Sequence, residues 1–212
     1  MEGAIVERLR RSSDCRLHSQ LLNAPLIYDA NGKQALTAIY QEYVDVASEA
    51  AVPILLCTPT WRANAARVHA AEVPVSINLD AVAFLQKFRD AQIHPDSEIK
   101  IGGLLGCKND CYQPGEGLSV AEAQAFHQWQ IEQLAFGGVD YLIAETLPNV
   151  DEALGIAKAM ESTGVPYIIS FVISRDGRLL DTTGLSDAVK YIDLNTACLL
   201  YTSDAADDLQ PV

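Results

Sequence analysis

The stretch from Tyr141 to Val150 reads YLIAETLPNV, and it joins a buried strand to a carboxylate. Residues 142–144 form a short apolar run, which is typical of a strand inside a parallel sheet. Glu145 follows directly, and Pro148 ends the strand because proline has no backbone N–H to donate. Burying a carboxylate is costly unless a cation or a hydrogen-bond donor meets it. We therefore expect Glu145 to have a binding partner at the end of this strand.

Strands and helices alternate on both sides of this stretch. The strand runs are continuously apolar, whereas the helical segments carry apolar residues on one stripe, as expected for a parallel sheet covered by helices. The predicted strands are 54–57, 99–106, 139–147 and 165–174, and the predicted helices are 33–51, 62–71, 79–91, 118–138, 149–164 and a last one that begins at residue 186.

Two of these helices carry start signals. Ser119 and Glu122 have the spacing of a capping box, in which each residue satisfies a free backbone N–H of the first turn. Asn149 is predicted to cap the next helix, and Asp151 and Glu152 are acidic residues of its first turn, where the helix dipole favours negative charge.

The two candidate folds are a doubly wound sheet and a (β/α)8 TIM barrel. Neither G-x-G-x-x-G after the first strand nor G-x-x-x-x-G-K-[ST] occurs, which removes the usual phosphate-loop support for the doubly wound sheet. The sequence predicts an α/β fold, an incomplete TIM barrel of roughly the first five βα units. Polar residues gather after each predicted strand, in CTPTW, GCKND, AETLP and SFVIS, where barrel enzymes place their chemistry.

Composition narrows the class of protein. The net charge of -13 argues against nucleic-acid binding, which depends on clustered Lys and Arg. The sequence shows no apolar run of bilayer length and no signal-peptide pattern, so we expect a soluble, cytoplasmic protein with no membrane partner. Five cysteines without secretory context predict reduced thiols, and Cys107 and Cys111 form a C-x-x-x-C pair that is a weak candidate thiol site.

Four segments together resemble the homocysteine S-methyltransferase family, a class of zinc-dependent barrel enzymes. The most specific match is in the segment 137–154, where Glu145-Thr146 is followed at the family's spacing by Glu152-Ala153. The resemblance runs from about residue 2 to residue 197. The segments are EGAIVERLRR (2–11), CTPTWRAN (57–64), GGVDYLIAETLPNVDEAL (137–154) and ISFVISRDGRLLDTTGLSDAV (169–189).

The resemblance implies methyl transfer from a sulfonium or ammonium donor to the thiol of homocysteine, a step of methionine biosynthesis. Glu145 would hold the amino group of homocysteine, which supplies the cation that its position demands. Glu2 and Gly3 would lie beside the substrate, although Glu2 replaces the Asp of the family, and Thr58 and Thr60 would line the pocket. Zn²⁺ held by three cysteine thiolates would bind the homocysteine sulfur.

The zinc ligands of the family have no counterpart in this sequence, which contains neither a G-x-N-C segment nor a Cys-Cys pair. We therefore predict no metal ligand and no catalytic residue in this chain. Residues 1–197 are predicted to be a partial homocysteine-binding barrel domain, and residues 198–212 to be a non-native tail that resembles translated sequencing adapter. A chain of this kind is expected to be inactive and unstable alone, and its oligomeric state stays open.

Three alternatives stay open beside this interpretation. A Schiff-base lyase or aldolase needs a lysine at a strand end, but Lys100 enters its strand and Lys108 lies past the glycine turn. A non-catalytic, barrel-derived binding module is the second alternative, and a thiol site at Cys107 and Cys111 is the third. His127, inside a helix, is interpreted as a surface or packing residue.

Overall fold

The computed structural model describes residues 1, 3–12, 15–92, 98–196 and 200–205, the last six by their backbone alone. The chain divides into two compact units. The first contains residues 1–104 and 133–141, and the second contains residues 105–132 and 142–212. In the described part of the chain, none of the helices combines the length and the apolarity needed to traverse a bilayer.

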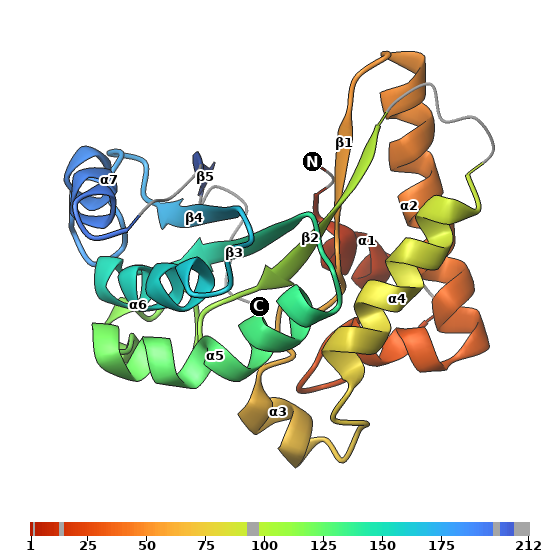
Figure 1. The fold of residues 1–212 in the computed structure, drawn as a ribbon, viewed down its shortest axis with the longest axis horizontal. Helices are drawn as coiled ribbons and strands as arrows, with labels where there is room; N and C mark the ends of the chain where they lie inside the picture. The colour runs from red at the N-terminus through yellow and green to blue at the C-terminus, as the bar shows by residue number, and fades with distance from the viewer. Residues whose placement is uncertain (2, 13–14, 93–97, 197–199, 206–212) are drawn as a thin grey trace. The chain divides into compact units, whose positions relative to one another are not determined.

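The first unit is built on two parallel strands, β1 (Ile54–Cys57) and β2 (Ile99–Leu105), paired from Ile54 opposite Ile99 to Cys57 opposite Gly102. Helix α2 packs on β1 (Figure 1). The side chain of Asp29 begins α2 by accepting a hydrogen bond from the Gly32 N–H at 2.7 Å. The helical elements of this unit are α1 (Ile5–Arg11), the 3₁₀ helix η1 (Ala24–Tyr28), α2 (Ala30–Glu49), α3 (Ala65–Ala70) and α4 (Ile77–Asp90).

Tyr40 shows how the apolar stripe of α2 forms the core of this unit. Its side chain is fully buried, and its ring lies 5.9 Å from that of Phe88 and 6.4 Å from that of Phe84. Its hydroxyl donates to the carbonyl of Cys57 at 2.7 Å, so the buried polar atom is satisfied. The stripe predicted from helical spacing is therefore confirmed as the face that α2 buries.

The second unit holds three parallel strands, β3 (Tyr141–Leu147), β4 (Tyr167–Ile173) and β5 (Leu200–Ala205). Its helices are α5 (Val120–Phe136), which ends in the first unit, α6 (Val150–Glu161) and α7 (Leu185–Asp193), and a 3₁₀ turn, η2, covers Pro114–Glu116. Six of the seven residues of β4 are buried, as a central parallel strand requires. Helix α6 packs against β4 and α7 (Figure 1).

The parallel strands with intervening helices confirm the predicted α/β fold. The two predicted caps are also present, because the Glu122 carboxylate accepts from the N–H of Ser119 and the Asn149 side chain accepts from the N–H of Glu152. Strand β5 falls inside residues 198–212 and pairs in parallel with β4. No observation of the fold tests whether that segment is native, so the non-native tail stays a prediction.

Candidate functional site

Glu145 lies in an irregularity of β3. The pairing of β3 with β4 is regular through Ala144 opposite Ile169, and it resumes only at Leu147 opposite Phe171. Glu145 and Thr146 therefore form a bulge, the device that strands use to redirect a side chain near a binding site. Glu145 is partly exposed, whereas the three residues before it are buried.

Thr146 carries the strain of this bulge. Its φ is 58°, in the left-handed region that β-branched residues rarely adopt. Its hydroxyl donates to the carbonyl of Glu145 at 2.6 Å, which offsets part of the cost. A strained backbone of this kind persists only where its surroundings hold it in place, and such positions concentrate at functional sites.

Thr58 and Thr60 lie together after β1, both buried. Thr60 donates to the carbonyl of Leu104 at 2.6 Å, so the 2.6 Å contact between the two hydroxyls has Thr58 as its donor. Thr58 in turn accepts from the N–H of Leu104 at 2.9 Å. The two hydroxyls thus form a closed set of hydrogen bonds with the backbone of β2, and their predicted place in a substrate pocket stays a prediction.

The N-terminal pair of predicted site residues is described only in part. The carbonyl of Gly3 accepts a hydrogen bond from the hydroxyl of Tyr43, which ties the start of the chain to α2. Glu2 lies outside the described residues. Gly3, Thr58 and Thr60 belong to the first unit and Glu145 belongs to the second.

Sequence reasoning missed a buried hydrogen bond between α5 and α6. His127 and Glu152 are 0% and 1% exposed, and His127 Nε2 donates to Glu152 Oε1 at 3.0 Å. The interpretation of His127 as a packing residue holds, whereas a surface position is wrong. Glu152 is a buried acceptor, in addition to being an acidic residue of the first turn of α6. The only available signal was the 25-residue separation of a helical His and a helical Glu, which by itself predicts nothing.

The pKa of Glu152 reflects two opposed effects. Burial raises the pKa of this carboxyl, but hydrogen bonds from His127 and from the backbone N–H groups of Lys108 and Leu118 favour the charged form and outweigh burial. The net pKa lies below the usual value for glutamate. Glu152 is therefore a carboxylate at neutral pH.

The cysteines do not form a metal site within the described residues. Cys15, Cys57, Cys107 and Cys111 carry free thiols, and all except Cys15 are buried. Among the residues that the structure describes, no group of three or more His, Cys, Asp or Glu side chains could hold a metal ion. The described residues therefore do not fit the three-thiolate zinc site that the resemblance implies.

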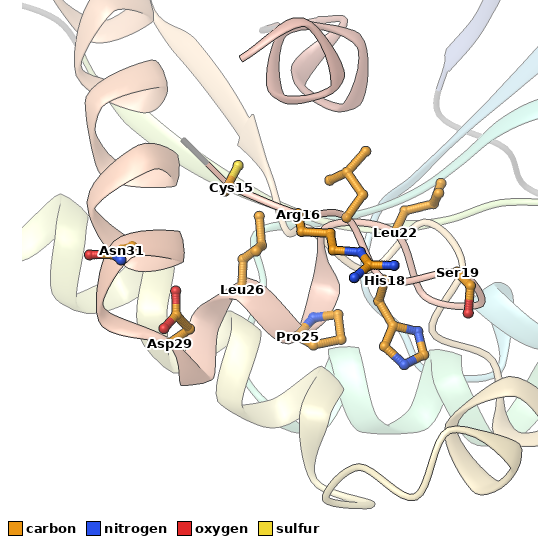
Figure 2. Close-up of a pocket in the computed structure, with 10 residues that line it drawn as sticks. Cys15, Arg16, His18, Ser19, Leu22, Pro25, Leu26, Asp29 and Asn31 are labelled. Carbon is orange, nitrogen blue, oxygen red and sulfur yellow. The ribbon is translucent and has the colours of Figure 1, made fainter. Parts of the chain in front are cut away.

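The first unit also contains a cavity of about 570 Å³, within the range of small-molecule sites. Arg16, His18 and Ser19 lie on one side of it, and Asp29 and Asn31 lie on the other (Figure 2). Backbone N–H groups of Gln20 and Leu21 point at His18 Nδ1 at 3.1 and 3.2 Å, which makes this atom an acceptor and leaves Nε2 as the donor. The carboxylate of Asp29 accepts the hydrogen bond that caps α2, so its position is explained by the structure of this helix. The remaining lining residues are Cys15, Leu17, Leu22, Pro25 and Leu26.

Parallel strands alternating with helices, with polar side chains near the C-terminal ends of the strands, are typical of a class of α/β proteins that includes the barrel enzymes. The sequence profile of one family in this class, homocysteine S-methyltransferase, matches residues 1–201. The chain belongs to the homocysteine S-methyltransferase family.

Solved structures agree with this assignment at the level of the fold. The oxidised form of the homocysteine methyltransferase MmuM from Escherichia coli superposes with a TM-score of 0.79 at 21% identity, over 94% of this chain and 70% of that one. Its metallated form gives a TM-score of 0.77 at 22% identity, over 94% and 72%. Its apo form gives 0.66 at 21% identity, over 95% and 69%. No curated protein matches the sequence.

Proposed function

We propose that this chain binds homocysteine for S-methylation and that Glu145 holds the substrate's ammonium group. The observation that carries the proposal is the bulge of β3, which places a carboxylate at the C-terminal end of a buried strand in a member of this family. An ammonium ion and a partly exposed carboxylate carry opposite charges, so a hydrogen bond between them is a charge-assisted one. Glu2, Gly3, Thr58 and Thr60 are proposed to complete the surroundings of the substrate.

The proposed reaction, assigned to the full-length parent, moves one methyl group, and the inactivity of this chain alone stays a prediction. The thiolate of homocysteine attacks the methyl carbon of a sulfonium or quaternary ammonium donor, a new S–C bond forms, and the electron pair of the broken bond stays with the donor as a neutral thioether or amine. The product is methionine, because methionine is S-methylated homocysteine. The part assigned to this chain is to orient the amino acid through Glu145, so that the sulfur faces the methyl carbon.

Zinc enters this proposal only as an expectation of the family resemblance. The four free thiols of the described residues belong to no cluster that could bind a metal, and no step is assigned to a metal here. The alternative thiol site at Cys107 and Cys111 finds little support, since both side chains are buried and buried structural cysteines are typically unreactive. Cys107 instead donates its S–H to the carbonyl of Asn109 at 3.4 Å.

The test compares homocysteine with 4-mercaptobutanoate, which has the same thiol and carboxylate but no ammonium. By isothermal titration calorimetry the chain should bind homocysteine more tightly, by roughly 10- to 100-fold for one charged hydrogen bond. Glu145→Gln should abolish this preference without weakening the binding of 4-mercaptobutanoate. Glu161→Gln, which changes an exposed carboxylate at the end of α6, is the matched control and should retain the preference. Equal binding of the two ligands by the unmodified chain would refute the role of Glu145.

A further inference from the structure

The first turn of α6 is bonded to the loops that follow β2 and β4. Glu152 Oε1 accepts from the N–H of Lys108 at 2.8 Å, and Glu152 Oε2 accepts from the N–H of Leu118 at 3.4 Å. Lys108 and Leu118 lie near the two ends of the loop between β2 and α5. One carboxylate therefore holds both ends of that loop.

The hydrogen bonds of His127 indicate that the contact between His127 and Glu152 joins a neutral imidazole to a carboxylate. Its Nε2 donates to Glu152, whereas its buried Nδ1 has no hydrogen-bond partner. A protonated imidazole would bury an unsatisfied N–H at Nδ1, so the neutral tautomer with its proton on Nε2 fits this environment. The negative charge of Glu152 is instead balanced by backbone N–H groups and by the N-terminus of α6, where the helix dipole is positive.

Asn149 and Asp181 extend the same arrangement. Asn149 caps α6 through its carbonyl oxygen, and its side-chain nitrogen donates to the carbonyl of Pro114, in the loop that Glu152 holds, at 3.1 Å. Asp181, in the loop between β4 and α7, accepts from the N–H of Val150 at 2.9 Å and from the N–H of Thr183 at 2.8 Å. The loops after β2, β3 and β4 are thus joined at one helix terminus.

This junction begins three residues after Thr146, whose left-handed backbone needs external support. We propose that Glu152 is a positioning residue: together with Asn149 and Asp181 it fixes the first turn of α6, and that turn holds the Glu145–Thr146 bulge in place. The inference rests on the proposed function, because the group being positioned is the carboxylate that binds the homocysteine ammonium. Glu152 itself touches no substrate and acts through the backbone.

Glu152→Gln is the direct test. A glutamine has one acceptor oxygen for three donors, so its NH₂ group must face an N–H that the carboxylate accepted from. Hydrogen exchange followed by NMR should therefore show faster exchange at the Lys108 or Leu118 amide. The preference of the chain for homocysteine over 4-mercaptobutanoate should fall, on the order of tenfold, because misplacing a binding group by about 1 Å has effects of that size or larger.

Two further variants make the test decisive. Glu122→Gln is the matched control, because Glu122 also accepts from a loop backbone N–H, that of Ser119, but lies exposed at the start of α5. It should leave the ligand preference unchanged. If Glu152→Gln fails to fold, Asp181→Asn replaces it, since that change weakens only the bonds from Val150 and Thr183 and should also reduce the preference.

The outcomes separate the two proposals. The positioning role is overturned, and the proposed function stays intact, if Glu145→Gln loses the preference for homocysteine but the folded Glu152→Gln variant keeps it. The same holds if the folded Asp181→Asn variant keeps the preference. Unchanged exchange at both Lys108 and Leu118 in Glu152→Gln also overturns it. No preference in the unmodified chain refutes the role of Glu145, and the positioning role with it.

Discussion

Replacing Gly155 by alanine should destabilise the chain, although alanine is the better helix former. In a helix interior the exchange of glycine for alanine normally stabilises by about 1 kcal/mol. A Cβ at this position of α6 would, however, lie 2.4 Å from the carbonyl oxygen of Val120 and 2.5 Å from the Cβ of Ala123. Ordinary contact distances are about 3.5 Å, so α5 and α6 would have to separate locally by about 1 Å.

The magnitude follows from these opposed effects. Overpacking a tightly packed contact costs about 1–3 kcal/mol and sometimes more, and here one of the atoms met belongs to the backbone, which cannot rotate away. Because backbone atoms are met, the cost should lie in the upper part of this range, about 2–3 kcal/mol. After subtraction of about 1 kcal/mol gained in helix propensity, we expect Gly155→Ala to lower the free energy of unfolding by about 1–2 kcal/mol.

Urea denaturation followed by circular dichroism measures this difference. Gly115→Ala is the matched control, because a Cβ there would meet no atom within 4 Å, and it should change stability by less than about 0.5 kcal/mol. A Gly155→Ala chain that is as stable as the unmodified chain, or more stable, would contradict the close approach of α5 and α6.

Two further predictions concern the bulge and the buried carboxylate. Thr146→Asn should match or exceed the stability of the unmodified chain in urea denaturation, because asparagine tolerates positive φ. Thr146→Val keeps the strain and loses the hydroxyl, so it should be less stable than the unmodified chain by about 1 kcal/mol. Equal stability of the two variants would argue against strain at this residue. Because the pKa of Glu152 is lowered in the folded chain, the unfolded chain binds the proton of this carboxyl more tightly. The contribution of the carboxylate to the free energy of unfolding is therefore fully present above the unfolded pKa of about 4.3 and is lost as pH falls through the folded pKa. Thermal melting between pH 7 and pH 3 should accordingly show a steeper acid loss of stability for the unmodified chain than for Glu152→Gln, and parallel curves would contradict the assignment.

The features that sequence predicted well depend on neighbours in the chain. The strand of residues 54–57 was found with its bounds because Pro53 precedes a short apolar run and Pro59 follows it. The caps at Ser119 and Asn149 were found because a helix start is a pattern of three or four residues. Local chemistry of this kind needs no knowledge of the tertiary structure.

The features that sequence missed depend on distant contacts. Glu152 matches the usual pattern of an acidic first turn, and this pattern is the same whether the carboxylate faces solvent or the backbone of a remote loop. Nothing in a threonine predicts positive φ, so the bulge at Thr146 could not be read from residue types. The carboxylate at Glu145 was noticed only because a charge at the end of a buried strand is locally unusual.

The hydroxyls of Thr58 and Thr60 continue the hydrogen bonding between β1 and β2 beyond the end of β1. Once the backbone of β1 has turned away, a donor and an acceptor on side chains stand in for the missing peptide group opposite Leu104. The sheet is thereby lengthened by side-chain chemistry, and a threonine at either position has a structural reason to be there that is independent of any ligand. Comparing these two residues between relatives would therefore report on the integrity of this corner of the fold, and would be a poor guide to which methyl donor or thiol a relative accepts.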